Sequence, residues 1–289
     1  IGWCDWSSDV CSSDLLLNED NCAWSPNGDK LLLGYYLYDQ VNQNKLLDIK
    51  KIVDKDSTRF TWGESDSNHL YYLAQNRIYS LDINAQIAKT IVNNNATDYI
   101  AKNNNLFYLS HGNNSEILKI ININNSELIR EISLPSSNYI FINRDNNLIN
   151  ILDKTHNTLY LIDPFSEIKP VIEIINNVKT AHWMNNEKLI FTNDNELWIY
   201  NIKYYSKTLL TRISDKIQNA FPFVNEYYIF YTTDGTINVM ELDERDKYNV
   251  VKLSDLEIID SPVLNSKGNA LYFCSKIGAN SGIYKLIIQ

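Results

Sequence analysis

The sequence has little of what marks several common classes of functional site. Its 289 residues include nine glycines, four cysteines and four histidines. It contains no glycine-rich phosphate loop, and no two of its histidines have the spacing of a metal site. No apolar run approaches the ~20 residues that are needed to span a bilayer. The sequence therefore predicts no metal, no cofactor and no membrane span in this stretch of chain.

The charge balance is acidic, with a formal net charge of −9 and a pI near 5.0. A nucleic-acid-binding domain needs a basic stripe, so we expect no nucleic-acid partner. Charged residues make up 21% of the chain, close to the average for soluble domains, which argues against wholesale disorder. Asparagine is in excess, with 39 residues. Because the asparagines fall between apolar runs, we interpret them as a sign of AT-rich coding rather than a prion-like tract.

The head of the chain has an unusual composition. Asp5–Leu15 reads DWSSDVCSSDL, which resembles a translated sequencing adapter. We therefore expect residues 1–15 to be non-native and base the fold on residues 16–289. Any targeting segment would then lie upstream. Two of the four cysteines belong to this head; Cys22 and Cys274 remain, and they are too far apart to form a metal motif, so we expect two small buried side chains.

The body of the chain repeats. Short apolar runs alternate with polar turns every ~8–12 residues, which is typical of an all-β sandwich, barrel or propeller. A bulky anchor, a polar turn and an apolar strand recur together at intervals of 37 to 42 residues. The anchors are Trp24, Trp62, Tyr99, Phe141, Trp183, Phe223 and Val263.

Each repeat has room for four strands, which is the signature of a propeller blade. The sequence therefore predicts an all-β fold, a seven-bladed β-propeller of four-stranded blades; six or eight blades, or a sandwich or barrel, are the alternatives. Aromatic residues, 12% of the chain, would fill the gaps between blades. We predict a single domain over 16–289, with blades near 16–54, 55–93, 94–134, 135–176, 177–215, 216–256 and 257–289.

The last repeat ends after its third strand. Propellers often close by mixing strands from both termini in one blade, which removes exposed edges. The apolar run just before the first anchor is Leu15–Asn18. We therefore expect Leu15–Asn18 to supply a short or imperfect fourth strand to the last blade.

One repeat carries a recognisable motif. The string CAWSPNGDKLLL, residues 22–33, resembles the repeat of TolB-type propellers, which are relatives of the WD repeat. Asn27 stands where that repeat usually has aspartate, and the other blades keep the spacing without the motif. The resemblance implies a non-catalytic binding or scaffold module of a bacterial envelope protein, such as those that follow a membrane anchor and a PEGA domain. It also implies a location in the cell envelope.

Two enzymatic hypotheses stand beside this interpretation. Related propellers accompany serine peptidases, and the chain would then be the propeller of a larger enzyme; its nearest string to a GxSxG nucleophile motif, residues 278–282, lacks the spacing. Other propellers act on glycans in their own channel, which needs acids that converge on the axis. Asp20 and Asp260 are the candidates for that role. His69, His111 and His156 are expected in polar turns.

A polar position recurs near the start of the innermost strand of each predicted blade. Side chains there face the axial channel or its mouth, where propellers commonly bind ligands. We therefore predict a protein, small-molecule or glycan partner at this mouth, and no catalytic residue. The candidate binding residues are Asp20, Thr58, Arg59, Asn95, Ser137, Asn138, Lys179, His182, Asn219 and Asp260.

Overall fold

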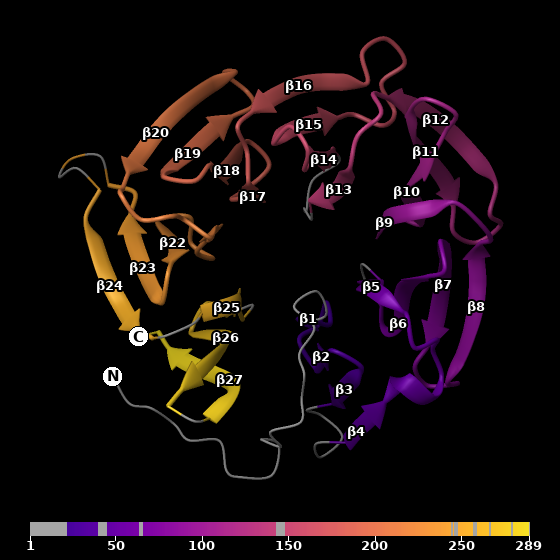
Figure 1. Cartoon of the computed structure of the whole chain (residues 1–289), viewed down its shortest axis with the longest axis horizontal. Coiled ribbons are helices and arrows are strands. Elements are labelled where there is room, and N and C mark those ends of the chain that lie inside the picture. The colour runs from indigo at the N-terminus through magenta and orange to yellow at the C-terminus, as the bar shows by residue number, and fades with distance from the viewer. Residues whose placement is uncertain are drawn as a thin grey trace. The chain divides into compact units, whose positions relative to one another are not determined.

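The computed structural model of the protein describes most of the chain after residue 21. The described residues are 22–39, 45–63, 66–142, 148–243, 245, 248–256, 259–265, 267–278 and 280–288. The chain divides into two compact units, one within residues 16–141 and one within residues 142–289. Both are built from antiparallel sheets whose strands lie side by side in chain order (Figure 1).

The unit within residues 16–141 contains three four-stranded sheets. Their strands are β1 (Cys22–Trp24), β2 (Lys30–Leu33), β3 (Tyr36–Asp39) and β4 (Lys45–Asp48); β5 (Thr58–Gly63), β6 (Asp66–Ala74), β7 (Arg77–Asp82) and β8 (Ile87–Val92); and β9 (Ala96–Lys102), β10 (Asn105–His111), β11 (Glu116–Asn122) and β12 (Leu128–Leu134). One short 3-10 helix, η1 (Ile49–Lys51), follows β4.

The remaining sheets repeat the same order. Their strands are β13 (Tyr139–Ile142), β14 (Ile149–Asp153), β15 (Thr158–Ile162) and β16 (Val171–Asn176); β17 (Thr180–Trp183), β18 (Lys188–Thr192), β19 (Glu196–Asn201) and β20 (Ser206–Arg212); β21 (Asn219–Pro222), β22 (Tyr228–Thr233), β23 (Thr236–Glu241) and β24 (Val250–Asp255); and β25 (Ile259–Leu264), β26 (Ala270–Ile277) and β27 (Asn280–Ile287). The last sheet has three strands among the described residues.

Asparagine makes many of the tight turns between these strands. Asn103 and Asn104 join β9 to β10 with φ angles of 49° and 58°. Positive φ at both central residues suits a two-residue hairpin turn, and asparagine tolerates it better than most side chains. Six of the thirteen described non-glycine residues with positive φ are asparagines. The asparagine excess therefore has a structural use, since it lets the chain reverse with few glycines.

The cores lie between neighbouring sheets. Strands β2 and β3 of the first sheet pack against β5, β6 and β7 of the second, and the shared cluster includes Leu32, Leu37, Phe60, Trp62, Leu70, Tyr72 and Leu81. The ring of Phe60 stacks on that of Tyr72, with centroids 5.6 Å apart. Equivalent clusters join the second sheet to the third, the fifth to the sixth and the sixth to the seventh. Aromatic side chains fill the gaps between sheets, as the sequence predicts.

These sheets confirm the predicted fold class. The chain is an all-β protein with seven blades arranged as a β-propeller, and six of the blades have four strands among the described residues. The predicted closing strand, Leu15–Asn18, lies outside the described residues. Among the described residues, no helix is long and apolar enough to cross a membrane.

Candidate functional site

The first strand of several blades carries a polar residue at one repeated register. Thr58, Asp98, Thr180, Asn219 and Asp260 each lie opposite the fourth residue of the apolar run in the next strand; those partners are Leu73, Leu109, Thr192, Thr232 and Cys274. Because their register is equal, these five residues occupy equivalent positions along the first strands of their blades. Three of them are predicted from the sequence, whereas Asp98 and Thr180 are not.

Asp98 is the centre of the best-formed polar contact in the unit within residues 16–141. Its side chain is 3% exposed, and its carboxylate accepts hydrogen bonds from Arg59 Nε at 2.7 Å and Arg59 Nη2 at 2.5 Å. It also accepts from the backbone N–H of Tyr99 at 2.8 Å and of Phe141 at 2.7 Å. Asp98 therefore bonds to β5, β9 and β13, the first strands of three successive blades.

Arg59 reaches this carboxylate from an unusual backbone position. Its φ is 55°, inside a bulge of β5 where the pairing with β6 shifts register. The hydroxyl of Tyr99 donates to the carbonyl of Arg59 at 2.5 Å, which holds the bulge in place. A strained backbone and a bidentate pair are both used to join neighbouring blades.

His182 and Asn219 make a similar contact in the other unit. His182 Nε2 lies 3.1 Å from Asn219 Oδ1, which also accepts from the backbone N–H of Ala220 at 2.9 Å. Asn219 thus accepts from the next residue and from the preceding blade, as Asp98 does. Desolvation lowers the pKa of His182, and the bond to Asn219 opposes this only in part. The imidazole is therefore neutral at physiological pH.

The structure places the other predicted site residues separately. Thr58 begins β5 and is exposed; Asn95 is exposed just before β9, with φ 59°. Ser137 and Asn138 lie in the connection from β12 to β13. Asp260 lies in β25, where only its backbone is described, and Asp20 lies outside the described residues. The structure thus brings together Arg59 with Asp98 and His182 with Asn219.

Counting from the anchors could not find Asp98. The repeat offset that selects Thr58 and Asn219 selects Asn95 in the third blade, three residues too early. The pairing of Asp98 with Leu109 shows the correct register. The available signal was the acid itself, since Asp98 is the one charged residue between Ala96 and Ala101.

Lys179 lines a polar cavity of about 440 Å³ in the unit within residues 142–289, which we call the Lys179 pocket. Its residues come from the β14–β15, β16–β17 and β18–β19 connections and from the end of β20. They are Asn157, Asn177, Lys179, Asn193, Asp194, Asn195, Glu196 and Arg212. Three connections from two successive blades therefore meet around one space.

The charges of the Lys179 pocket are balanced. Glu196 accepts from Asn193 Nδ2 at 2.6 Å, from Arg212 Nε at 2.7 Å and from Trp198 Nε1 at 3.0 Å. These bonds, that from Asn193 first, lower the pKa of Glu196 and hold it ionised. Lys179 pairs with Asp194. Lys179 and Arg212 are therefore each paired with a neighbouring acid inside the pocket.

Two amides of the Lys179 pocket are unused. Among the described residues, the side chains of Asn157 and Asn177 make no hydrogen bond. Both residues have positive φ, at 51° and 61°. A free primary amide offers two donors and one acceptor. The pocket can therefore hydrogen-bond a polar ligand, such as an exposed peptide group, without attracting a net charge.

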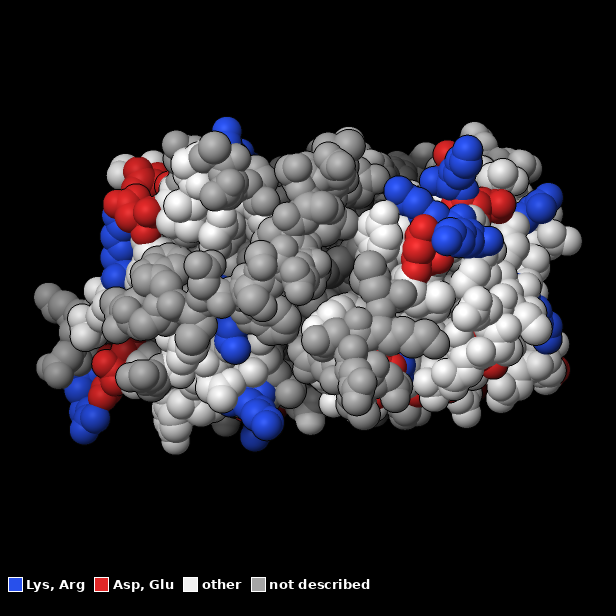
Figure 2. All heavy atoms as spheres, turned by 90° about the horizontal axis from the view of Figure 1, so that it is seen from below, with Lys and Arg blue, Asp and Glu red and all other residues white. Residues whose placement is uncertain are grey.

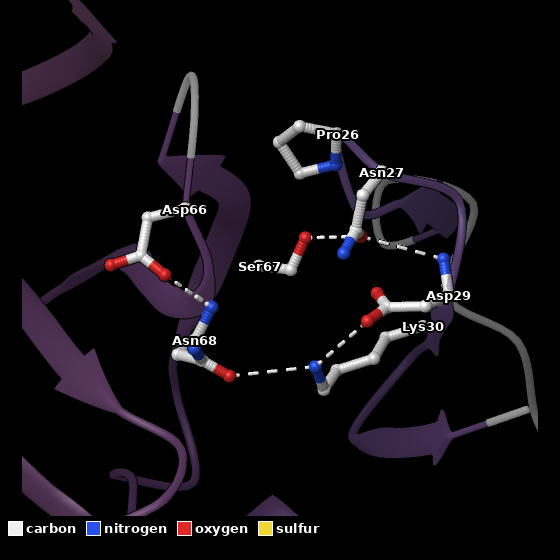
Figure 3. Close-up of a pocket in the computed structure, with 7 residues that line it drawn as sticks. All are labelled: Pro26, Asn27, Asp29, Lys30, Asp66, Ser67 and Asn68. Carbon is white, nitrogen blue, oxygen red and sulfur yellow. Dashed lines mark hydrogen bonds and ion pairs between the residues drawn. The ribbon is translucent and has the colours of Figure 1, made fainter. Parts of the chain in front are cut away.

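A second polar cavity, of about 550 Å³, lies between the first two blades, and we call it the Lys30 pocket (Figure 3). The β1–β2 turn supplies one side and the start of β6 the other. The lining residues are Pro26, Asn27, Asp29, Lys30, Asp66, Ser67 and Asn68. Two contacts cross the gap: Ser67 Oγ donates to Asn27 Oδ1, and Lys30 Nζ lies 3.4 Å from Asn68 Oδ1.

The local sequence builds the first side of the Lys30 pocket. Ser25 Oγ accepts from the backbone N–H of Lys30 at 2.9 Å and donates to Asp29 Oδ1 at 2.7 Å. Gly28 has φ 71°, which the tight turn requires. The Ser-Pro-Asn-Gly-Asp-Lys string therefore closes on itself and presents Lys30 to the second blade.

Three histidines each bond a carboxylate close in sequence. His69 pairs with Asp66, His111 with Glu116, and His156 with Asp153. His69 lies within β6 and His111 ends β10, so the expectation of polar turns is right only for His156. Among the residues that the structure describes, no three histidines, cysteines or acids gather as metal ligands would.

Basic and acidic side chains are interspersed on the surface. On the face drawn in Figure 2, the described lysines and arginines lie beside aspartates and glutamates. Ion pairs of this kind include Lys119–Glu131 at 2.8 Å and Lys203–Glu187 at 3.4 Å. The coloured residues of this face form no basic stripe.

Comparisons with solved structures identify the fold. The chain is similar to a chain of the crystal structure of a mitotic checkpoint complex, with a TM-score of 0.68, 11% identity and coverage of 100% of this chain and 99% of that one. It is also similar to the C-terminal WD40 domain of Sif2, with a TM-score of 0.66, 13% identity and coverage of 93% and 81%. The chain is a seven-bladed β-propeller with WD40-like structural neighbours.

The propeller also resembles an enzyme component in shape. A chain of Kuenenia stuttgartiensis hydrazine synthase matches with a TM-score of 0.66, 12% identity and coverage of 98% and 99%. No protein-family model matches the chain, and no curated protein matches it. At these identities the structural neighbours show the fold of the propeller and carry no activity over to it.

Proposed function

We propose that this propeller is a non-catalytic binding or scaffold module. The observation that carries the proposal is the Lys179 pocket, where connections from two blades present unused amides and balanced charges around one open space. The propeller fold commonly binds proteins, through loops that a rigid set of blades holds in place. A polar recognition surface with balanced charges suits a peptide segment with exposed backbone groups.

The buried polar groups of the first strands support a non-catalytic role. Arg59 and Asp98 hold each other, and His182 holds Asn219. A general acid or base must reach a substrate proton and have a pKa near the working pH. Asp98 already accepts four hydrogen bonds from protein donors, so its carboxylate joins blades and is not presented to a substrate.

A displayed library of random linear peptides tests the binding role. Peptides selected on the purified chain should bind it and lose about tenfold in affinity, about 1.4 kcal/mol, when Asn157→Gly and Asn177→Gly are combined. Glycine accepts the positive φ at both positions, so the double variant should fold. The proposal is wrong if no peptide is enriched, or if the double variant binds the selected peptides as well as the parent chain.

A matched control is available in the other unit. Asn104 is exposed, has φ 58°, and its side chain makes no hydrogen bond among the described residues. Asn104→Gly makes the same chemical change on the same backbone conformation, away from the Lys179 pocket. Peptide affinity should be unchanged in this variant.

We also propose that the propeller belongs to a TolB-like protein of the bacterial envelope. The support is the Trp24–Lys30 string, whose turn closes through Ser25. Sequencing the genomic region upstream of residue 16 tests this assignment. A membrane anchor followed by a PEGA domain would support it, whereas a neighbouring α/β-hydrolase segment with GxSxG would replace it with the propeller of a serine peptidase.

A further inference from the structure

We propose that the Lys30 pocket binds a saccharide, a neutral ligand rich in hydroxyl groups. This site lies between the first two blades, within residues 16–141, and shares no residue with the Lys179 pocket. Four features of its lining carry the inference: an under-bonded ammonium, one spare amide donor, opposed charges and one apolar ring.

The ammonium of Lys30 is buried and incompletely bonded. Its side chain is 11% exposed, and Nζ lies 3.3 Å from Asp29 Oδ2 and 3.4 Å from Asn68 Oδ1. The contact with Asp29 exceeds the usual ammonium–carboxylate distance of about 2.7–2.9 Å, and the contact with Asn68 exceeds the usual N–H···O distance of about 2.7–3.2 Å. The third N–H has no partner among the described residues. A ligand oxygen at this position would satisfy a cation that is otherwise costly to bury.

Asn27 adds one spare donor to the lining. Its Oδ1 accepts from Ser67 Oγ, and its amide nitrogen donates to the carboxylate of Asp29, so the second amide N–H is left without a partner among the described residues. Its amide nitrogen faces the space between the two blades (Figure 3). Donors from Asn27 and Lys30 and acceptors from Asp29 and Asn68 therefore surround one space, as vicinal hydroxyls require, since each hydroxyl both donates and accepts.

The charges around the Lys30 pocket select a neutral ligand. A metal cation that approached Asp29 would meet the ammonium of Lys30 at the same carboxylate. A phosphate or carboxylate that approached Lys30 would meet Asp29 and Asp66. Charges of both signs within a few ångströms partly cancel, so the attraction of either kind of ion is weakened, whereas a neutral hydroxyl can bond to both.

Pro26 supplies the apolar part of the lining. The pyrrolidine ring of Pro26 lies at the edge of the cavity, beside Asn27 (Figure 3). A pyranose ring has a C–H face that packs on such a surface and hydroxyl groups around its rim that bond to polar side chains. The volume of about 550 Å³ falls within the range of about 300–1,000 Å³ typical of small-molecule sites.

Titration of the full chain with glucose, galactose, mannose, N-acetylglucosamine and their disaccharides, followed by NMR, tests the proposal. At least one neutral sugar should bind at millimolar concentration, and Lys30→Met should weaken it at least about tenfold. Asn68→Ala, at a half-buried position, should weaken it too, which keeps the test decisive if Lys30→Met does not fold.

The fifth blade supplies the matched control. Lys188 begins the second strand of its blade, as Lys30 does, but is exposed, so Lys188→Met should leave sugar binding unchanged. Calcium chloride and sodium phosphate are the competing ligands. The proposal is overturned if no sugar binds, if the two pocket variants bind as well as the parent chain, or if either ion binds in place of the sugars.

Discussion

At the scale of single residues, Asp98 shows how the propeller uses its buried charge. A carboxylate that is 3% exposed would be unstable without partners, and Arg59 with two backbone N–H groups supplies four bonds. The pair is buried on one side only, since the Arg59 side chain is 34% exposed. Removing the acid therefore leaves Arg59 partly solvated and leaves the backbone N–H groups of Tyr99 and Phe141 without this acceptor.

Asp98→Ala should lower the free energy of unfolding by about 3 kcal/mol, because it breaks a buried pair from one side. Chemical denaturation followed by circular dichroism measures the change. The control is Asp243→Ala, which removes an exposed pair with Arg245, at 2.5 Å, and should leave stability unchanged. Equal effects of the two substitutions would contradict the role assigned to Asp98.

His182 makes stability depend on pH in a defined direction. Desolvation lowers its pKa in the folded chain, so the unfolded chain binds more protons as the pH falls through the ordinary histidine value of about 6.5. This contribution is fully present above about pH 6.5 and is lost as the pH falls below it.

His182→Gln removes the titration and keeps an N–H donor for Asn219. The stability of the parent chain should fall relative to this variant on acidification below about pH 6.5, and the difference should be constant above it. Parallel pH profiles for the two proteins, measured by urea denaturation, would show that His182 does not titrate with folding.

At the scale of strands and turns, backbone conformation decides which residues fit. The β19–β20 turn holds Tyr205 at φ 49°, whereas the corresponding turns hold Gln86 and Ser126 at 56° and 58°. A tyrosine gains nothing from this conformation, and its side chain is 67% exposed. The turn is therefore a place where the local sequence and the required geometry disagree.

Tyr205→Asn should raise the free energy of unfolding by about 0.5 kcal/mol, because asparagine tolerates left-handed backbone better than an aromatic residue. Its neighbour Tyr204 is 68% exposed and is not among the residues with positive φ. Tyr204→Asn should give no gain. Thermal denaturation of the two variants side by side checks this, and a larger gain at Tyr204 would contradict it.

The fold class was easier to predict than side-chain roles. The anchors and apolar runs predicted a fold of four-stranded blades, because burial against two neighbours imposes a long-period pattern on the sequence. No pattern in the sequence predicts the β-bulges. Those in β5 and β9 shift the strand register, and so they decide that Thr58 and Asp98 occupy the shared polar position in their strands. The Lys30 pocket needs contacts between separate blades, which no local pattern records.

At the scale of the whole molecule, neighbouring blades within each compact unit share hydrophobic cores: the first with the second, the second with the third, the fifth with the sixth and the sixth with the seventh. Leu70 is fully buried in the cluster that joins the first blade to the second. Repeat proteins of this kind gain stability from nearest-neighbour interfaces as well as from each repeat. A cavity at one interface should therefore loosen the two blades that share it before it affects the others.

Leu70→Ala should lower stability by about 3 kcal/mol. In native-state hydrogen exchange, amides of β1–β4 and β5–β8 should lose protection together, while those of β17–β20 keep theirs. Leu197→Ala, at a fully buried position between the fifth and sixth blades, should give the reverse pattern. Uniform loss across all blades in both variants would show that the interfaces do not act as separate units.

The shared carboxylate of Asp98 also bears on how such a chain can change length. Propellers that gain or lose a repeat must insert or delete a whole blade and still close every interface. A copy of the third blade placed beside the original would separate Asp98 from Arg59 on one side or from Phe141 on the other. One of the two acids would then be buried without its partner. The Asp98 contacts therefore make duplication of the third blade costly, and repeat duplication is easier elsewhere in the sequence.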